Sequence, residues 1–168
     1  MKTISLKDFA LTGFIDKITT GSSTDELVKN FGNPEYIFDT DDCGIMYYGD
    51  YEFHYWKNTK TIYLIQNVTL SSKMINFINS SFNVDPWFLK TGREFTFKEV
   101  KSILEKETVK YTIDHENDFI TFKSGVFLDF VSGYKGYGGN NEHIENWKNF
   151  DISVNDVEDY ILKGIRKE

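Results

Sequence analysis

The 168-residue chain carries 26 Asp or Glu and 19 Lys or Arg residues, and its net charge of -7 disfavours binding to nucleic-acid backbones and to anionic membranes. Its single cysteine, Cys43, excludes a disulfide framework and a thiolate zinc cage within one chain. The N-terminal residues do not form a secretory signal, and no stretch approaches the roughly 18 apolar residues of a spanning helix. We therefore expect a cytoplasmic protein that folds as one domain with its own core.

Cap residues mark the first predicted elements. Ser5 precedes a short apolar helix that ends at Gly13. Ser23 and Glu26 form a capping box for a second helix, which stops at Gly32. Apolar and aromatic runs separated by polar turns then predict strands at residues 36–38, 45–48, 51–55 and 61–68.

The second part of the chain repeats this order of signals. Asp85 and Pro86 open a short apolar helix, and Thr96 with Glu99 forms another capping box. Residues 69–84 fit either a strand or a bridging segment. Strands are expected after the second capped helix, at residues 109–113, 119–122 and 126–130.

The C-terminal residues predict a helix. Ser153 with Asp156 forms its cap, and Val157, Tyr160 and Ile161 follow at helical spacing. The predicted fold class is α+β, with two tandem helix-turn-helix plus antiparallel meander repeats whose sheets form one continuous or packed layer, followed by this C-terminal helix. Within a single domain of residues 1–168, the repeats cover about residues 5–68 and about residues 85–131, and a C-terminal extension covers residues 132–168.

These signals resemble known families. The stretch from Ile18 to Tyr48, with Gly21 before the helix and Phe31-Gly32-Asn33-Pro34 after it, resembles the small outer-membrane assembly lipoproteins. A tandem copy is similar to the secreted β-lactamase inhibitor protein fold, whose concave sheet grips a protein partner. Residues 48–55 are similar to cytoplasmic bacterial proteins associated with toxin-neutralising immunity genes. We expect no export signal in this chain, in contrast to the first two families, so the resemblance implies a binding sheet inside the cell and not a catalytic site.

An acidic turn overlays part of a calcium-loop pattern. Asp39, Asp41 and Gly44 match its start, and Asp50 takes the place of the usual bidentate Glu. Cys43 stands where a third oxygen ligand belongs. The pattern therefore predicts a solvated hairpin turn, and we expect no metal and no cofactor.

Catalytic motifs are not found. His54, His115 and His143 have no second His at ligand spacing and no placed acid or base partner, so no catalytic residue is expected. Cys43 has Asp41 and Asp42 as neighbours, which disfavour a thiolate nucleophile.

Aromatic and acidic residues make protein binding the favoured function. The glycine-rich segment 133–139 lacks the Lys-Ser/Thr ending of a phosphate cradle, so we expect a surface loop in which Tyr134 and Tyr137 contact a partner. A second aromatic and acidic surface is expected on the first meander, and its partner-binding residues are Tyr48, Asp50, Tyr51, Glu52, His54, Tyr55 and Trp56.

Three functions remain open on sequence grounds. The first is a non-enzymatic immunity-type inhibitor that neutralises a basic toxin by direct binding. The second is a small hydrolase with a site assembled around His54 with Asp50 and Glu52. The third is an oligomeric structural or assembly module that uses the sheet edge. The sequence does not fix the oligomeric state or the partner's identity.

Overall fold

The computed structural model describes residues 2–70, 81–91, 93–114, 118–131 and 157–168, and its centre is an eight-stranded antiparallel sheet. The strand order across the sheet is β2-β3-β4-β5-β10-β9-β8-β7. A second, two-stranded sheet pairs β1 with β6 in parallel. The predicted α+β class is confirmed at this level. The strands are β1 (Lys2–Ser5), β2 (Tyr36–Asp39), β3 (Cys43–Tyr48), β4 (Tyr51–Trp56), β5 (Thr61–Asn67), β6 (Phe82–Asp85), β7 (Thr112–Asp114), β8 (Phe119–Thr121), β9 (Val126–Val131) and β10 (Ile161–Lys167).

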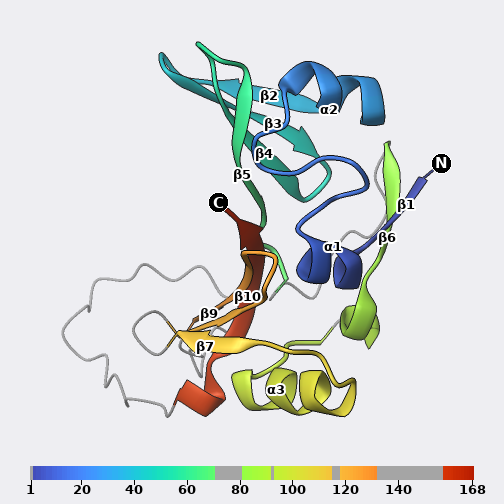
Figure 1. The fold of residues 1–168 in the computed structure, drawn as a ribbon, viewed down its shortest axis with the longest axis vertical. Coiled ribbons are helices and arrows are strands. Elements are labelled where there is room, and N and C mark those ends of the chain that lie inside the picture. The colour runs from blue at the N-terminus through green and yellow to red at the C-terminus, as the bar shows by residue number, and fades with distance from the viewer. Residues whose placement is uncertain (1, 71–80, 92, 115–117, 132–156) are drawn as a thin grey trace, which may run out of the picture.

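The helices lie along one side of the large sheet (Figure 1). They are α1 (Leu6–Thr12), α2 (Thr24–Phe31) and α3 (Phe97–Lys106), with short 3-10 helices η1 (Trp87–Thr91) and η3 (Val157–Asp159). We call the elements from β1 to β5 the first half and those from β6 to β10 the second half. Along the long axis of the molecule β2 to β5 lie above β7 to β10, whereas β1 and β6 lie side by side at the same level (Figure 1). No helix among the described residues is long and apolar enough to cross a membrane.

Each α-helix begins at the cap residue that the sequence predicts. The Ser5 hydroxyl accepts a hydrogen bond from the Asp8 amide, and α1 ends at Gly13, whose φ of 77° favours glycine. Full capping boxes start the other two helices, with Ser23 and Glu26 on α2 and with Thr96 and Glu99 on α3. These local predictions are confirmed because cap hydrogen bonds involve only neighbours along the chain.

The same backbone contacts join helix and sheet in both halves. In the first half the Thr24 amide donates to the Lys60 carbonyl at 2.9 Å, just before β5 begins. In the second half the Phe97 amide donates to the Tyr160 carbonyl at 2.8 Å, just before β10 begins. The start of each capped helix is therefore fixed to the start of the strand that ends its half.

The C-terminal helix prediction is wrong, because residues 161–167 form β10 in the middle of the sheet. Leu162 and Ile165 are both buried, and the strand pairs with β5 on one side and β9 on the other. A bulge between Leu162 and Gly164 interrupts the alternation, so Gly164 and Ile165 are buried in succession and the two-residue period is hidden in the sequence. The proposed cap at Ser153 and Asp156 lies outside the described residues. The undecided segment supplies β6 at its end, and residues 71–80 also lie outside the description.

An aromatic cluster ties the halves together on the helix side of the sheet. Phe82 of β6 packs against Phe31 of α2 at 4.9 Å between ring centroids and against Tyr51 of β4 at 5.8 Å. Tyr48 contacts the Phe31 and Phe53 rings, and all of these side chains are buried. Such ring pairs contribute about 0.5–1.5 kcal/mol each beyond the area they bury, so β6 contributes to the core of the first half.

Gly164 offers a test of the β5–β10 junction. A Cβ atom at this position would lie 2.8 Å from the Asn67 carbonyl oxygen and 3.3 Å from the Val68 Cα, and neither backbone atom can move without distorting the neighbouring strand. We expect Gly164→Ala to lower the free energy of unfolding by about 1–3 kcal/mol, measured by urea denaturation. Lys163→Ala, which changes an exposed side chain at the adjacent position, is the control and should unfold like the parent protein. Equal urea midpoints for Gly164→Ala and the parent would contradict this packing.

Candidate functional site

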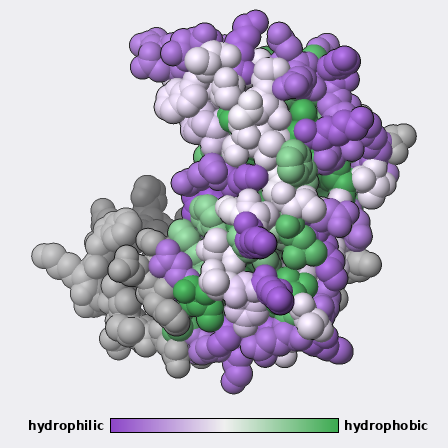
Figure 2. Space-filling model, in the orientation of Figure 1, coloured by the Kyte–Doolittle hydropathy of each residue, from purple (hydrophilic) through white to green (hydrophobic). Residues whose placement is uncertain are grey.

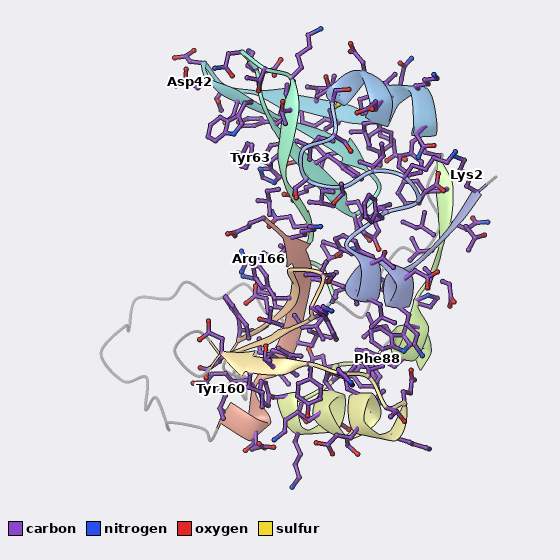
Figure 3. All side chains as sticks on the ribbon, in the orientation of Figure 1. Lys2, Asp42, Tyr63, Phe88, Tyr160 and Arg166 are labelled. Carbon is purple, nitrogen blue, oxygen red and sulfur yellow. The ribbon has the colours of Figure 1, made fainter. Side chains whose placement is uncertain are left out.

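The side of the large sheet opposite the helices, here called the open face, carries an unbroken row of side chains. Directly paired residues of antiparallel strands point to the same face, so one row can be followed through the strand register. Figure 3 shows that Tyr63 and Arg166, from neighbouring strands of the two halves, both extend away from α1. Across all eight strands the row consists of Tyr36, Tyr47, Glu52, Gln66, Arg166, Phe127, Thr121 and Thr112.

Aromatic rings cover the first half of the open face. Trp56 stacks on Tyr63 with ring centroids 4.4 Å apart, and Tyr63 contacts the edge of His54 at 6.0 Å. Tyr63 occupies a bulge, because His54 pairs with Leu64 while Tyr55 pairs with Ile62. Burial raises the pKa of Tyr63, and the neighbouring Cys43 thiol adds to this shift. Trp56 itself is 46% exposed, so the ring is held on one side and remains accessible.

A polar cluster lies beside these rings. The carboxylate oxygen Oε2 of Glu52 lies 2.8 Å from His54 Nε2, which donates to it, and Gln66 Nε2 donates to the same oxygen at 2.7 Å. Glu52 and His54 are two residues apart on β4, so both side chains point to the open face, and Gln66 is paired with Glu52 from β5. The cluster is thus positioned before any ligand arrives. Tyr47 lies next to it, and burial, followed by the Glu52 charge, raises the pKa of this tyrosine.

The second half places a charged pair on the same face. Arg166 donates through Nη2 to the Asp129 carboxylate at 2.7 Å, and the Asp129 side chain is only 10% exposed. The guanidinium lies over Phe127 at 5.1 Å and over Phe119 at 5.7 Å, two rings that stack on each other at 4.8 Å. Because this ion pair is largely buried, the removal of either residue would leave the other as an uncompensated buried charge and would destabilise the fold.

The structure corrects part of the predicted binding surface. Tyr48, Tyr51 and Tyr55 are buried on the helix side, so they cannot contact a partner. Strand alternation is the reason: on β4 the odd positions from Tyr51 to Tyr55 face the helices, and the even positions face away. The open face therefore carries the other residues predicted on this strand, namely Glu52, His54 and Trp56. Asp50 lies in the turn before β4, and Tyr134 and Tyr137 lie outside the described residues.

Other residues of the open face are missed by sequence reasoning. Gln66 and Asp129 are each a polar residue within an apolar strand, and this pattern could have marked them. Arg166 could not be found, because its strand is predicted as a helix. Tyr63 is hidden by the bulge, which reverses its expected side.

The acidic turn connects β2 and β3 in a β-hairpin. Asp39 accepts a hydrogen bond from the Tyr55 hydroxyl at 2.9 Å and lies 3.8 Å from the Lys57 amino group. Gly44 allows this contact, because a Cβ there would collide with the Tyr55 ring. Within the described part of the chain, no group of at least three His, Cys, Asp or Glu residues is arranged to hold a metal ion. His115 and His143 lie outside that part.

No protein family model, curated protein or solved structure matches this chain. The resemblances drawn from the sequence therefore stay predictions.

The raised pKa of Tyr48 provides a test of its burial on the helix side of the sheet. Burial raises its pKa to about 12, and its hydroxyl donates to the Gly32 carbonyl at 2.8 Å. An unfolded tyrosine ionises near pH 10, so between about pH 10 and pH 12 the unfolded chain loses a proton that the folded chain keeps. We expect the free energy of unfolding to fall over this range, as measured by urea denaturation at several pH values. The fall should be smaller in Tyr48→Phe and unchanged in Tyr36→Phe, whose side chain is exposed; an identical fall in all three proteins would refute the assignment.

Proposed function

We propose that this chain is a non-enzymatic protein-binding module, most concretely an immunity-type inhibitor that neutralises a basic toxin by direct binding. The observation that carries the proposal is the open face of β3, β4 and β5, where Trp56, Tyr63 and Tyr47 surround the Glu52–His54–Gln66 cluster. Aromatic side chains give large contact areas with few rotatable bonds, and they are enriched in the centres of protein interfaces. A rigid sheet lowers the ordering cost of such an interface.

Charge favours a basic partner. The net charge of -7 attracts cationic proteins over the range of the Debye length and raises their association rate. Glu52 on the open face and the exposed Asp41 and Asp42 at the hairpin end place negative charge around the aromatic rings. A toxin that acts on nucleic acid needs a basic surface, and such a surface is complementary to this one. A cytoplasmic, bacterial setting is part of the same proposal.

We also propose that the two halves are tandem repeats. The order of strand, short helix, capped helix and four antiparallel strands in each half supports this, as do the matching contacts at Thr24 and Phe97. A duplication would explain how one small sheet became a surface long enough for a protein partner, because β5 and β10 then join the halves edge to edge.

Co-expression with the product of the adjacent upstream gene tests the function. We expect the pair to co-purify and the chain to restore growth when that product is toxic. Trp56→Ala should weaken the complex by about tenfold or more, since aromatic anchors at interface centres often cost over 2 kcal/mol when truncated. Phe14→Ala is the matched control, because Phe14 is 44% exposed, close to the 46% of Trp56, but follows α1 on the helix side.

Other results would contradict the inhibitor function or the proposed contact surface. A toxic neighbour that stays toxic and forms no complex would rule out the inhibitor function. Equal loss of binding in the two variants would mean that the open face is not the contact surface. A mass of several copies that no partner changes would favour an assembly module, for which the exposed edge strand β2 is the available contact.

The Glu52–His54 hydrogen bond favours a small hydrolase as the second candidate. A carboxylate that orients an imidazole is one part of an acid/base site, although the bond occupies Nε2. If the chain hydrolyses any ester or phosphoester, His54→Ala should abolish turnover. Gln66→Ala should leave part of it, because the Gln66 amide donates to the Glu52 carboxylate and lies 3.2 Å from His54 Nε2, and its loss leaves the imidazole in place. Turnover that survives His54→Ala would exclude this site.

A further inference from the structure

A shallow depression lies at the end of the first half, where the turns of two hairpins meet. Its volume is about 460 Å³, and its position next to the open face is marked by Asp42 and Tyr63 in Figure 3. The turn between β2 and β3 provides one wall and the turn between β4 and β5 the other, joined by the hydrogen bond from the Lys57 amide to the Asp42 carbonyl. The lining residues are Asp41, Asp42, Trp56, Lys57, Asn58 and Thr59.

The indole of Trp56 is a fixed platform in this wall. One face of the ring lies on Tyr63 at 4.4 Å with an interplanar angle of 26°. The side chain is 46% exposed and lines the depression. An electron-rich ring that is held in place and open on one side attracts cations, and tryptophan does so most strongly.

Two carboxylates beside the Trp56 indole have no side-chain partner among the described residues. Asp41 and Asp42 form no side-chain hydrogen bond or ion pair with any residue in the described ranges, unlike Asp39, which bonds the Tyr55 hydroxyl. The one cation in the lining, Lys57, directs its amino group at the Thr40 carbonyl, 3.0 Å away, and towards Asp39. The depression therefore combines free negative charge with an aromatic face.

We infer that this depression binds the guanidinium group of an arginine side chain presented by the protein partner. A planar guanidinium stacks on an indole and bonds carboxylates through its fork of donors, whereas a lysine ammonium has no plane to stack. A calcium ion needs six to eight oxygen ligands, and two free carboxylates do not supply them. The partner in this inference rests on the proposed function, but the preference for guanidinium is measurable without it.

The test uses the full ¹⁵N-labelled chain and N-acetyl-arginine amide as the probe. The indole N–H signal of Trp56, assigned with Trp56→Phe, should shift saturably, while that of Trp87, whose Nε1 donates to Glu107, should stay in place. N-acetyl-citrulline amide, which has the same shape without charge, should cause no shift, and N-acetyl-lysine amide should bind several-fold more weakly. Asp41→Asn and Asp42→Asn should each weaken arginine binding by roughly threefold to tenfold. Asp25→Asn, on the highly exposed start of α2, is the matched control and should bind like the parent.

Opposite outcomes overturn the inference. It fails if citrulline shifts Trp56 as arginine does, if both Asn variants bind like the parent, if Trp56 does not move, or if calcium chloride displaces the arginine probe. These failures are distinct from failure of the proposed function. A toxin complex that forms normally with both Asn variants would retain the function and reject the arginine site, whereas arginine binding without any toxin complex would retain the site and reject the function.

Discussion

The pairing of β10 with β5 is the contact on which the rest of the structure depends. Ile165, Arg166 and Lys167 pair with Asn67, Gln66 and Ile65, and the same strand pairs with β9 on its other edge. Without this strand, each half would present an open sheet edge to solvent, where unpaired backbone groups invite association with other chains. The strand also places Arg166 beside Gln66, so the polar groups of the two halves share one row of the open face. The cost of this arrangement is a steric limit at Gly164, where the backbones approach too closely for any side chain.

Strand alternation places some aromatic residues in the core and others on the open face. On β4, Tyr51, Phe53 and Tyr55 face the helices and are buried, while Glu52, His54 and Trp56 face the other side. A chain rich in aromatic residues can therefore fill a core and also display rings on a surface, because neighbouring positions in a strand point to opposite faces. The open face keeps its rings in place by stacking and through the Glu52–His54–Gln66 contacts, so the proposed binding of a protein partner would cost little conformational entropy.

Local features of the fold could be predicted from the sequence, and long-range ones could not. The caps at Ser5, Ser23 and Thr96 depend on residues within one helical turn, so their signals are readable. The role of β6, in the middle of the chain, depends on its parallel pairing with β1 near the N-terminus, and no local pattern marks that pairing. In the candidate site, Glu52, His54 and Trp56 could be named but their face could not, because both faces of the first meander carry aromatic residues. The bulge at Tyr63 on β5 and the bulge between Leu162 and Gly164 on β10 interrupt the two-residue period, so the sequence pattern does not show which face these residues occupy.

The distribution of charge around the open face supports the proposed binding role. Catalysis needs a reacting group that is held next to an acid or base in a site that excludes water. Here the Glu52 carboxylate is shared between His54 and Gln66, and the imidazole packs against the ring of Tyr63, whose pKa is raised by burial. Among the described carboxylates of β2 to β5 and their turns, Asp41 and Asp42 are the ones without a side-chain partner, and they lie at the exposed hairpin end beside Trp56. Unpaired carboxylates at the rim would attract a cationic protein and so favour its steering towards this surface. The hydrogen-bonded cluster at the centre is already formed, so its burial in an interface would cost little.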